Sequence, residues 1–245
     1  MARTCFAVFA LGCVVFLTGL ANAQPPGRRG GRPPRRQANN PQTEPQGADA
    51  EETKILEAIQ KMKEGPRYAN VSSMDGRLMR LLAETSDAKR VVEIGTSTGE
   101  SASWLALALR KTGGHLYTHE IDEGRAEVAQ ANFEKAELDN VITIIMGDAH
   151  KTVLRYQDPN DELFVDTENG EFIDILFLDA DKPGYIDYLD KLVPLIRPGG
   201  LIIAHNMVYP TPDPNYIKAI TTDPKFETLF LLMNGAGVGV TMKKR

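Results

Sequence analysis

Two hydrophobic spacings alternate along the chain from residue 51 onward. Apolar residues three and four positions apart predict helices, and the first such stripe consists of Ile55, Leu56, Ile59 and Met62. Short runs of consecutive apolar residues stand between the helical stretches and are typical of strands that are buried on both faces. The alternation therefore predicts βαβ units, which form a mainly parallel α/β sheet with helices on both sides.

The last two predicted strands have no helix between them, so one of the two is expected to run antiparallel to the rest. The predicted helices cover residues 51–65, 73–86, 100–113, 124–138, 150–156, 185–196 and 215–223, the second with Ser73 as its N-cap. The predicted strands cover residues 89–95, 114–122, 141–149, 172–180, 199–206, 226–233 and 237–245. The acidic connection 155–171 is long for such a fold, and we interpret it as an insertion rather than a lid.

Residues 1–23 have the layout of a signal peptide. A short start with Arg3 precedes an apolar run, and the small residues Ala21, Asn22 and Ala23 close the segment. This layout predicts cleavage after Ala23 and export of the protein to the periplasm or out of the cell. The apolar run is short for a bilayer span, which needs about 20 residues.

A membrane anchor is the alternative for the same segment. Five arginines follow the apolar run within residues 24–50, and the positive-inside rule would then keep the next domain in the cytoplasm. Residues 24–50 are rich in Pro, Gly, Arg and Gln and have no hydrophobic period, which predicts a disordered linker. The folded domain is accordingly predicted at residues 51–245.

The charge of the folded part argues against nucleic acid as its partner and favours a small molecule. Six of the 28 basic and two of the 33 acidic residues lie in the first 50 positions, which leaves 22 basic and 31 acidic residues and a net charge of −9. An acidic domain repels a polyanion. Both cysteines, Cys5 and Cys13, lie in the predicted signal peptide, so the mature chain is expected to have no disulfide and no cysteine metal site.

Polar residues follow the predicted strands at the end where ligands bind in parallel sheets. The first strand leads into Gly95 and Gly99, which permit a tight turn and a close approach of the backbone to a ligand. Their spacing is not the G-x-G-x-x-G of dinucleotide-binding folds, which weakens an NAD-dependent oxidoreductase as an alternative function. Glu120 ends the second strand at a position where an acid commonly accepts hydrogen bonds from a ribose, and Asp148 ends the third.

The ordered motifs resemble a known family. They are EIGTSTGESASWLALAL from Glu93, EID from Glu120, GDA from Gly147, DADK from Asp179 with Tyr185 and Tyr188 after it, and RPGGLIIAHN from Arg197. Over roughly residues 55–245 they look like the S-adenosylmethionine-dependent O-methyltransferases of the catechol and caffeoyl-coenzyme A type, which are class I methyltransferases. The resemblance implies a doubly wound, Rossmann-like sheet of seven strands with one antiparallel edge strand. It also implies methyl transfer from S-adenosylmethionine to a hydroxyl of a small aromatic acceptor, and a homodimer.

The resemblance assigns roles to individual residues. The cofactor is expected to contact Glu93, Gly95, Thr96 and Ser101 at its methionine end, Glu120 at the ribose, Asp148 and Ala149 at the adenine, and Asp179 and Asp181 nearby. Asp179 is also the expected metal ligand and Lys182 the expected general base. A divalent cation lowers the pKa of the acceptor hydroxyl, and a lysine can take its proton. The acceptor pocket is expected from residues before Gly76, from 155–171 and from 207–215.

The sequence departs from the metal-dependent members of this family at the end of the fifth strand. Those members have Asp-Asn there, whereas this chain has His205-Asn206, so a metal site would consist of Asp179, His205 and Asn206. Because an imidazole replaces a carboxylate, the site is less negative and softer. Four interpretations are open: a softer ion such as Mn, Fe or Zn, weak binding of Mg or Ca, a metal-free site with His205 as catalytic base, or a structural histidine. If the protein is exported, a cofactor-binding protein without transferase activity is a further alternative, because S-adenosylmethionine is made in the cytoplasm.

Overall fold

The chain divides after residue 44, and residues 45–245 form its second, compact unit. The computed structural model describes residues 43–65, 68, 70–208, 212–232 and 236–245. The predicted signal peptide and residues 24–42 of the predicted linker therefore lie outside the described residues. Within the described ranges, no helix combines the length and the apolar composition that a membrane crossing requires.

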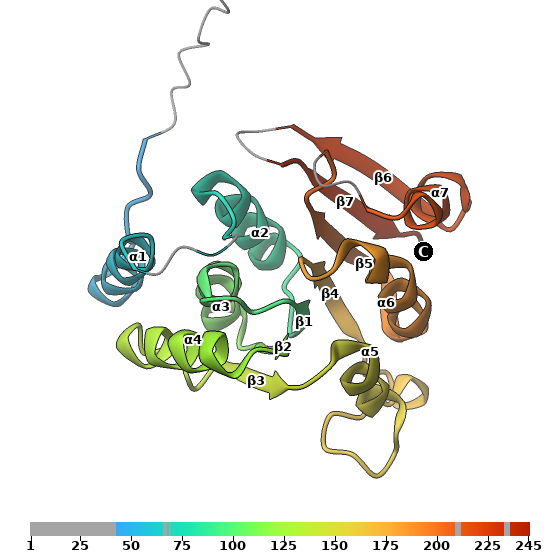
Figure 1. The fold of residues 1–245 in the computed structure, drawn as a ribbon, viewed down its shortest axis with the longest axis horizontal. Helices are drawn as coiled ribbons and strands as arrows, with labels where there is room; N and C mark the ends of the chain where they lie inside the picture. Colours follow the sequence, from blue (N-terminus) through green and yellow to red (C-terminus); the bar gives the residue numbers. More distant parts are fainter. Residues whose placement is uncertain (1–42, 66–67, 69, 209–211, 233–235) are drawn as a thin grey trace, which may run out of the picture. The chain divides into compact units, whose positions relative to one another are not determined.

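A sheet of seven strands forms the centre of the second unit, in the order β3-β2-β1-β4-β5-β7-β6 (Figure 1). The strands are β1 (Arg90–Ile94), β2 (His115–Glu120), β3 (Ile142–Met146), β4 (Ile173–Leu178), β5 (Ile196–His205), β6 (Phe226–Leu231) and β7 (Val238–Lys243). Strands β1 to β5 pair in parallel, and β7 pairs antiparallel with both β5 and β6. The predicted seven-stranded, mostly parallel fold is confirmed, and its antiparallel strand is β7, which lies between β5 and the edge strand β6.

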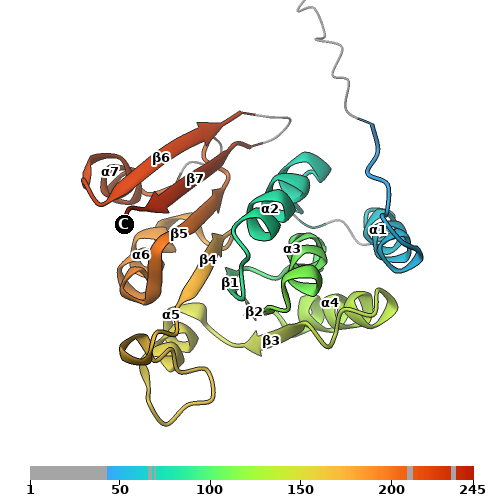
Figure 2. The same ribbon diagram turned by 180° about the vertical axis from the view of Figure 1, so that it is seen from behind.

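Helices cover both faces of the sheet, as the alternating pattern predicts (Figures 1 and 2). One face carries α1 (Ala50–Met62), α2 (Ser73–Thr85), α3 (Glu100–Thr112) and α4 (Glu123–Lys135). The other face carries α5 (Ala149–Thr152), α6 (Tyr185–Leu192) and α7 (Pro214–Thr222). Short 3₁₀ turns cover Val153–Gln157, Thr167–Asn169, Lys182–Gly184 and Val193–Leu195. Each face has its own apolar core, centred on Trp104 and Phe133 on the first face and on Tyr156 and Tyr185 on the second.

Capping side chains set where the helices start, and two of these positions differ from the prediction by one residue. The N-cap of α2 is Ser72 rather than Ser73, because Ser72 and Asp75 form a reciprocal capping box. Helix α1 begins at Ala50, where the Asp49 carboxylate accepts a hydrogen bond from the amide of Glu52. The last residues assigned to the linker therefore belong to the first helix and its cap.

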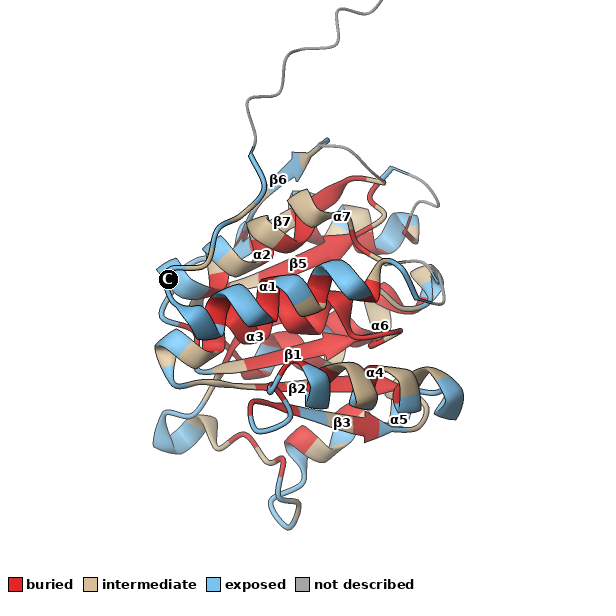
Figure 3. Cartoon of the chain, turned by 90° about the vertical axis from the view of Figure 1, so that its left-hand side faces the viewer, coloured by how far each residue is buried: buried red, intermediate tan, exposed pale blue. Residues whose placement is uncertain are grey.

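Strand β4 is buried at all six positions, of which five are apolar and one is Asp174. The neighbouring strand β1 is also buried over most of its length (Figure 3). The connection 155–171 packs at the opposite end of the sheet from the carboxyl ends of the strands. Arg90, the first residue of β1, donates a hydrogen bond to the carbonyl of Phe164 at 3.1 Å, and Val165 is buried. The position supports an insertion rather than a lid, and it removes this segment from the expected acceptor pocket.

Candidate functional site

A cleft of about 280 Å³ lies at the carboxyl ends of β1, β2 and β4. Six of the residues expected at the cofactor line it: Gly95, Thr96, Ser101, Glu120, Asp179 and Asp181. The strands meet there because β1 is the centre of the parallel part and has β2 on one side and β4 on the other. This is the switch in strand order at which open α/β sheets bind ligands.

The turn after β1 forms one wall of the cleft. Gly95 has φ of +104° and Gly99 has φ of +85°, which are conformations that L-residues with a side chain rarely adopt. A Cβ atom on Gly95 would lie 2.9 Å from the carbonyl oxygen of Asp179. Glycine is therefore needed at position 95 both for the backbone conformation and for the close approach of the loops after β1 and β4.

Glu120 is held at the cleft by backbone amides. One carboxylate oxygen accepts from the amide of Ser97 at 2.8 Å, and the other accepts from the amides of Ile121 and Asp122 at 2.9 and 3.0 Å. The residue is only 5% exposed, so these bonds also compensate for the loss of hydration. The oxygen bonded to Ser97 retains a lone pair for a ligand hydroxyl, which fits the expected ribose contact.

Glu93 lies behind the cleft and not in its lining. It is fully buried, and its two oxygens accept hydrogen bonds from the hydroxyls of Ser101 and Thr118, both at 2.5 Å. Burial raises the pKa of Glu93 to about 8 against the opposing effect of these bonds. Glu93 therefore does not face the cleft, where a direct contact with the cofactor was expected. It instead fixes Ser101 at the start of α3.

Asp148 and Ala149 lie beyond the end of β3. The Asp148 carboxylate accepts from the amide of His150 at 3.0 Å and caps the short helix α5. Neither residue lines the cleft around Gly95, so an adenine contact at this position stays a prediction.

Asp179 and Lys182 form a partly buried ion pair at the end of β4. The Lys182 Nζ donates to Asp179 Oδ1 at 2.9 Å and to the Tyr185 hydroxyl at 2.7 Å. Tyr185 in turn donates to the carbonyl of Leu178 at 2.8 Å, and burial raises its pKa, so the hydroxyl stays neutral. The lysine amine is therefore held in one place beside Asp179, which lines the cleft.

His205 lies between two carboxylates. Its Nδ1 is 3.1 Å from Asp179 Oδ2, and its Nε2 is 3.4 Å from Asp75 Oδ2 of helix α2. The ring N–H bonds do not align with these oxygens, so the contacts are ion pairs rather than linear hydrogen bonds. Burial alone would lower the pKa of His205, but the two carboxylates outweigh it and raise the pKa to about 9.

Two of the expected metal ligands are neighbours in the structure. Asp179 and His205 contact each other directly, and the second oxygen of Asp179 is bonded to Lys182. Within the part of the chain that the structure describes, no three His, Cys, Asp or Glu residues are grouped to hold a cation. Asp179, His205 and Asn206 as metal ligands therefore stay a prediction. A catalytic base at His205 stays a prediction.

Sequence reasoning missed Asp75, which is 3% exposed and faces His205. Its position three residues after Ser72 is explained by the capping box alone, so the sequence contains no second signal. It also missed Arg125 and Tyr68 at the cleft, where the guanidinium lies 4.9 Å from the centre of the tyrosine ring.

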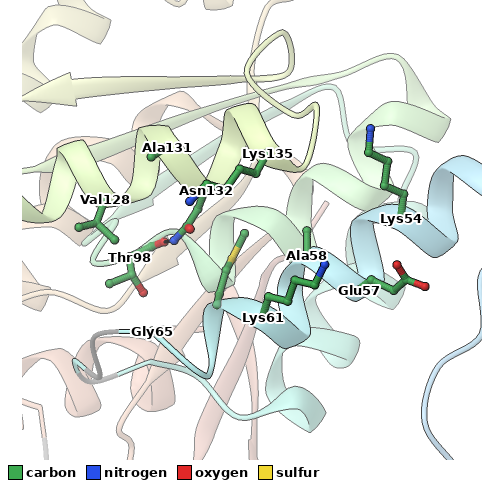
Figure 4. A pocket seen from close by; sticks show the side chains of 11 residues that line it. Lys54, Glu57, Ala58, Lys61, Gly65, Thr98, Val128, Ala131, Asn132 and Lys135 are labelled. Carbon is green, nitrogen blue, oxygen red and sulfur yellow. Dashed lines mark hydrogen bonds between the residues drawn. The ribbon is translucent and has the colours of Figure 1, made fainter.

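A larger cavity of about 510 Å³ lies between α1 and α4 (Figure 4). Its walls include the apolar side chains of Ala58, Val128 and Ala131, and lysines such as Lys61 and Lys135 stand at its rim. It contains none of the strand-end acids that could hold a nucleoside. The smaller cleft is the better candidate because the strand ends and Asp179, the ion-pair partner of Lys182, meet there.

Comparison with known proteins places the chain among methyl-transferring enzymes. The family model described as O-methyltransferase matches residues 46–229. The catechol O-methyltransferase of Niastella koreensis is 34% identical over 193 residues, which is 78% of this chain and 81% of that protein. Caffeoyl-CoA O-methyltransferase 2 of Eucalyptus globulus is 31% identical, over 71% of this chain and 74% of its own. The O-methyltransferase from Bacillus cereus, solved in complex with SAH, has a TM-score of 0.66 and 27% identity, and covers 78% of this chain and 91% of its own.

Proposed function

The chain belongs to the O-methyltransferase family and is an S-adenosylmethionine-dependent O-methyltransferase, and we propose that its acceptor is the hydroxyl of a small aromatic molecule. Family membership also decides against the two alternatives, an oxidoreductase and a binding protein without transferase activity. When bound, S-adenosylmethionine supplies a methyl group on a positively charged sulfur. The rest of the reaction depends on what the protein does with the acceptor and its proton.

The residues of the cleft fit the expected position of the cofactor. Gly95 lines the cleft at the turn after β1, and Glu120 is preorganised to accept a hydrogen bond from a ribose hydroxyl. Ser101 is fixed by its bond to the buried Glu93. These groups bind and orient, and their hydrogen bonds within the protein hold them in place before the ligand arrives.

The observation that carries the proposal is the amine of Lys182, fixed beside the cleft by Asp179 and Tyr185. In the transfer, the acceptor oxygen forms a bond to the methyl carbon as the carbon–sulfur bond breaks, and the hydroxyl proton passes to a base. Lys182 is the base we propose. Asp179 and Tyr185 would keep its nitrogen in one position through the transfer.

An aromatic acceptor is supported by the relatives, one named for catechol and one for caffeoyl-CoA. Phenolic hydroxyls lose a proton at a far lower pH than aliphatic alcohols, since a phenol in water has a pKa of about 10. A general base can therefore remove a phenolic proton more readily than the proton of an aliphatic alcohol.

The test is methylation of a panel of catechols, phenols, aliphatic alcohols and thiols, followed by mass spectrometry of the products. We expect methylated catechols or phenols and none of the other products. Lys182→Met should lower kcat by about 10²–10⁴-fold, the usual contribution of a general base, and leave S-adenosylmethionine binding intact. Lys151→Met, in a side chain that is 82% exposed, is the matched control. A protein that binds the cofactor and methylates no aromatic hydroxyl would contradict the proposal.

A further inference from the structure

We propose that Glu100 holds the ammonium group at the amino-acid end of S-adenosylmethionine. The inference rests on the proposed function, because it concerns how the same cleft orients the cofactor before the methyl transfer. Three observations carry it: the position of Glu100, a carboxylate oxygen that has no donor, and the charges around a second cavity.

Glu100 is the first residue of α3 and stands where two cavities adjoin. It lines the cleft at the strand ends and also a second cavity of about 330 Å³, and both have Tyr68, Asn70 and Val71 in their walls. The cleft alone, at about 280 Å³, is smaller than typical ligand pockets of about 300–1,000 Å³. With the ribose at Glu120, the second cavity gives the rest of the cofactor further space beside Glu100.

The Glu100 carboxylate is buried and incompletely satisfied. The residue is 3% exposed, and its Oε1 has no hydrogen-bond donor among the described residues. The Lys63 Nζ lies 3.9 Å from that oxygen, beyond hydrogen-bond distance, and donates to Ser73 Oγ and Gln60 Oε1 instead. Burial raises the pKa of Glu100 to about 6 against the opposing effects of Lys63 and Asn70, so the group is mostly charged at neutral pH. A buried carboxylate oxygen without a donor is costly, and a ligand that supplies the donor removes that cost.

The other acids of the cleft already receive donors from the protein. Glu120 accepts from three backbone amides, at 2.8, 2.9 and 3.0 Å. Asp179 accepts from Lys182 at 2.9 Å, and Asp181 accepts from a tyrosine hydroxyl at 2.7 Å. Among the four acids that the described residues bring to the cleft, Glu100 is therefore the one with a buried oxygen left for a cationic group.

The second cavity also has a positive side, which suits the other charge of an amino acid. Lys63 lines this cavity together with Ser72, the N-cap of α2, and Ser73, its first residue. A lysine ammonium and the free amides of a helix start both favour a carboxylate. The amino-acid end of the cofactor carries one ammonium and one carboxylate, so Glu100 and Lys63 match its two charges.

The experiment is calorimetry of the full-length protein with two ligands and no acceptor. One ligand is S-adenosylhomocysteine, the product that remains after methyl transfer, and the other is its analogue without the α-amino group. Three chains are compared: the natural one, Glu100→Gln and the control Glu123→Gln. Glu123 is the matched control because it is likewise the first residue of a helix, α4, and does not line the cleft. Glutamine keeps the size of glutamate and removes its charge, and melting curves verify that each chain is folded.

We expect removal of the amino group to weaken binding about 10–100-fold in the natural chain and in Glu123→Gln, as for a hydrogen bond between charged groups. Glu100→Gln should bind S-adenosylhomocysteine about 10–100-fold more weakly than the natural chain does, and removal of the amino group should then change the affinity by less than about threefold. An amino-group effect of equal size in the natural chain and in Glu100→Gln would overturn the proposal. So would a natural chain that binds both ligands within about threefold of each other, a comparison that needs no variant. A chain that methylates no aromatic hydroxyl would contradict the proposed function and leave these affinities unchanged.

Discussion

Substitution of Gly95 by alanine tests whether the turn after β1 controls both stability and cofactor binding. The new Cβ would lie 2.9 and 3.0 Å from the carbonyl oxygen and carbon of Asp179, which are backbone atoms that cannot rotate away. The positive φ of +104° adds about 1–2 kcal/mol for a residue with a side chain. Overpacking against a rigid neighbour adds about 1–3 kcal/mol. We expect Gly95→Ala to lower the free energy of unfolding by about 2–5 kcal/mol.

Gly113→Ala is the matched control. Gly113 ends helix α3 with φ of +74°, and a Cβ there would meet nothing within 4 Å. It therefore shows the cost of the backbone conformation alone, about 1–2 kcal/mol. Urea denaturation gives the two free energies, and calorimetry gives the affinity for S-adenosylmethionine. We expect binding to be weakened at least about tenfold in Gly95→Ala, corresponding to about 1.4 kcal/mol, and to be unchanged in Gly113→Ala. Equal stability losses and equal affinities in the two variants would refute the steric argument.

Three further outcomes can be measured. Glu120→Gln should weaken cofactor binding at least about tenfold. Glu93→Gln should leave the affinity within about threefold, because Glu93 lies behind the cleft and is already largely protonated near pH 7. Calorimetry near pH 7 compares the two affinities. Burial lowers the pKa of His119 to about 3. Between about pH 6.5 and pH 3, His119 therefore binds a proton in the unfolded chain but not in the folded chain. Stability should then fall by up to about 1.4 kcal/mol per unit as pH drops from 6.5 towards 3, and His119→Gln should flatten that slope in urea titrations. If residues 1–23 are a signal peptide, N-terminal sequencing of the exported protein should begin at Gln24; a chain that retains Met1 in the membrane fraction would favour the anchor.

The sequence was sufficient for the order of strands and helices and for the strand-end residues, because both depend on patterns of neighbouring positions. Apolar runs mark β1 and β4, and the polar residues that follow them have to lie at a sheet edge. The orientation of Glu93 could not be predicted in this way. It lies within β1, one residue from Ile94, and only the packing of α3 decides that its carboxyl points at Ser101 and away from the cleft.

The contact between Asp75 and His205 could not be predicted from neighbouring positions in the sequence either. It comes from a helix at the start of the domain, far along the chain from His205, and its local role as a capping residue is complete in itself. A long-range contact of this kind depends on how α2 packs over the ends of β4 and β5. The sequence alone shows only that a histidine stands at position 205 where the metal-dependent relatives have an aspartate. The contact with Asp75 adds that this histidine has a carboxylate on each side.

Strand register brings the chemistry of the site together. Ile94 of β1 is paired with Leu178 of β4, and Leu178 is paired with Ala204 of β5. The next residue of each strand therefore lies in one row across the sheet: Gly95, Asp179 and His205. A slip of one residue in β4 would turn Asp179 to the opposite face and separate it from both neighbours. Asp174 of β4 opposes that slip, because its carboxylate accepts hydrogen bonds from the backbone amides of Lys89 and Arg90 at the start of β1. The register of β4 is thus part of the arrangement of the site, because it holds Asp179 between the glycine turn and the histidine.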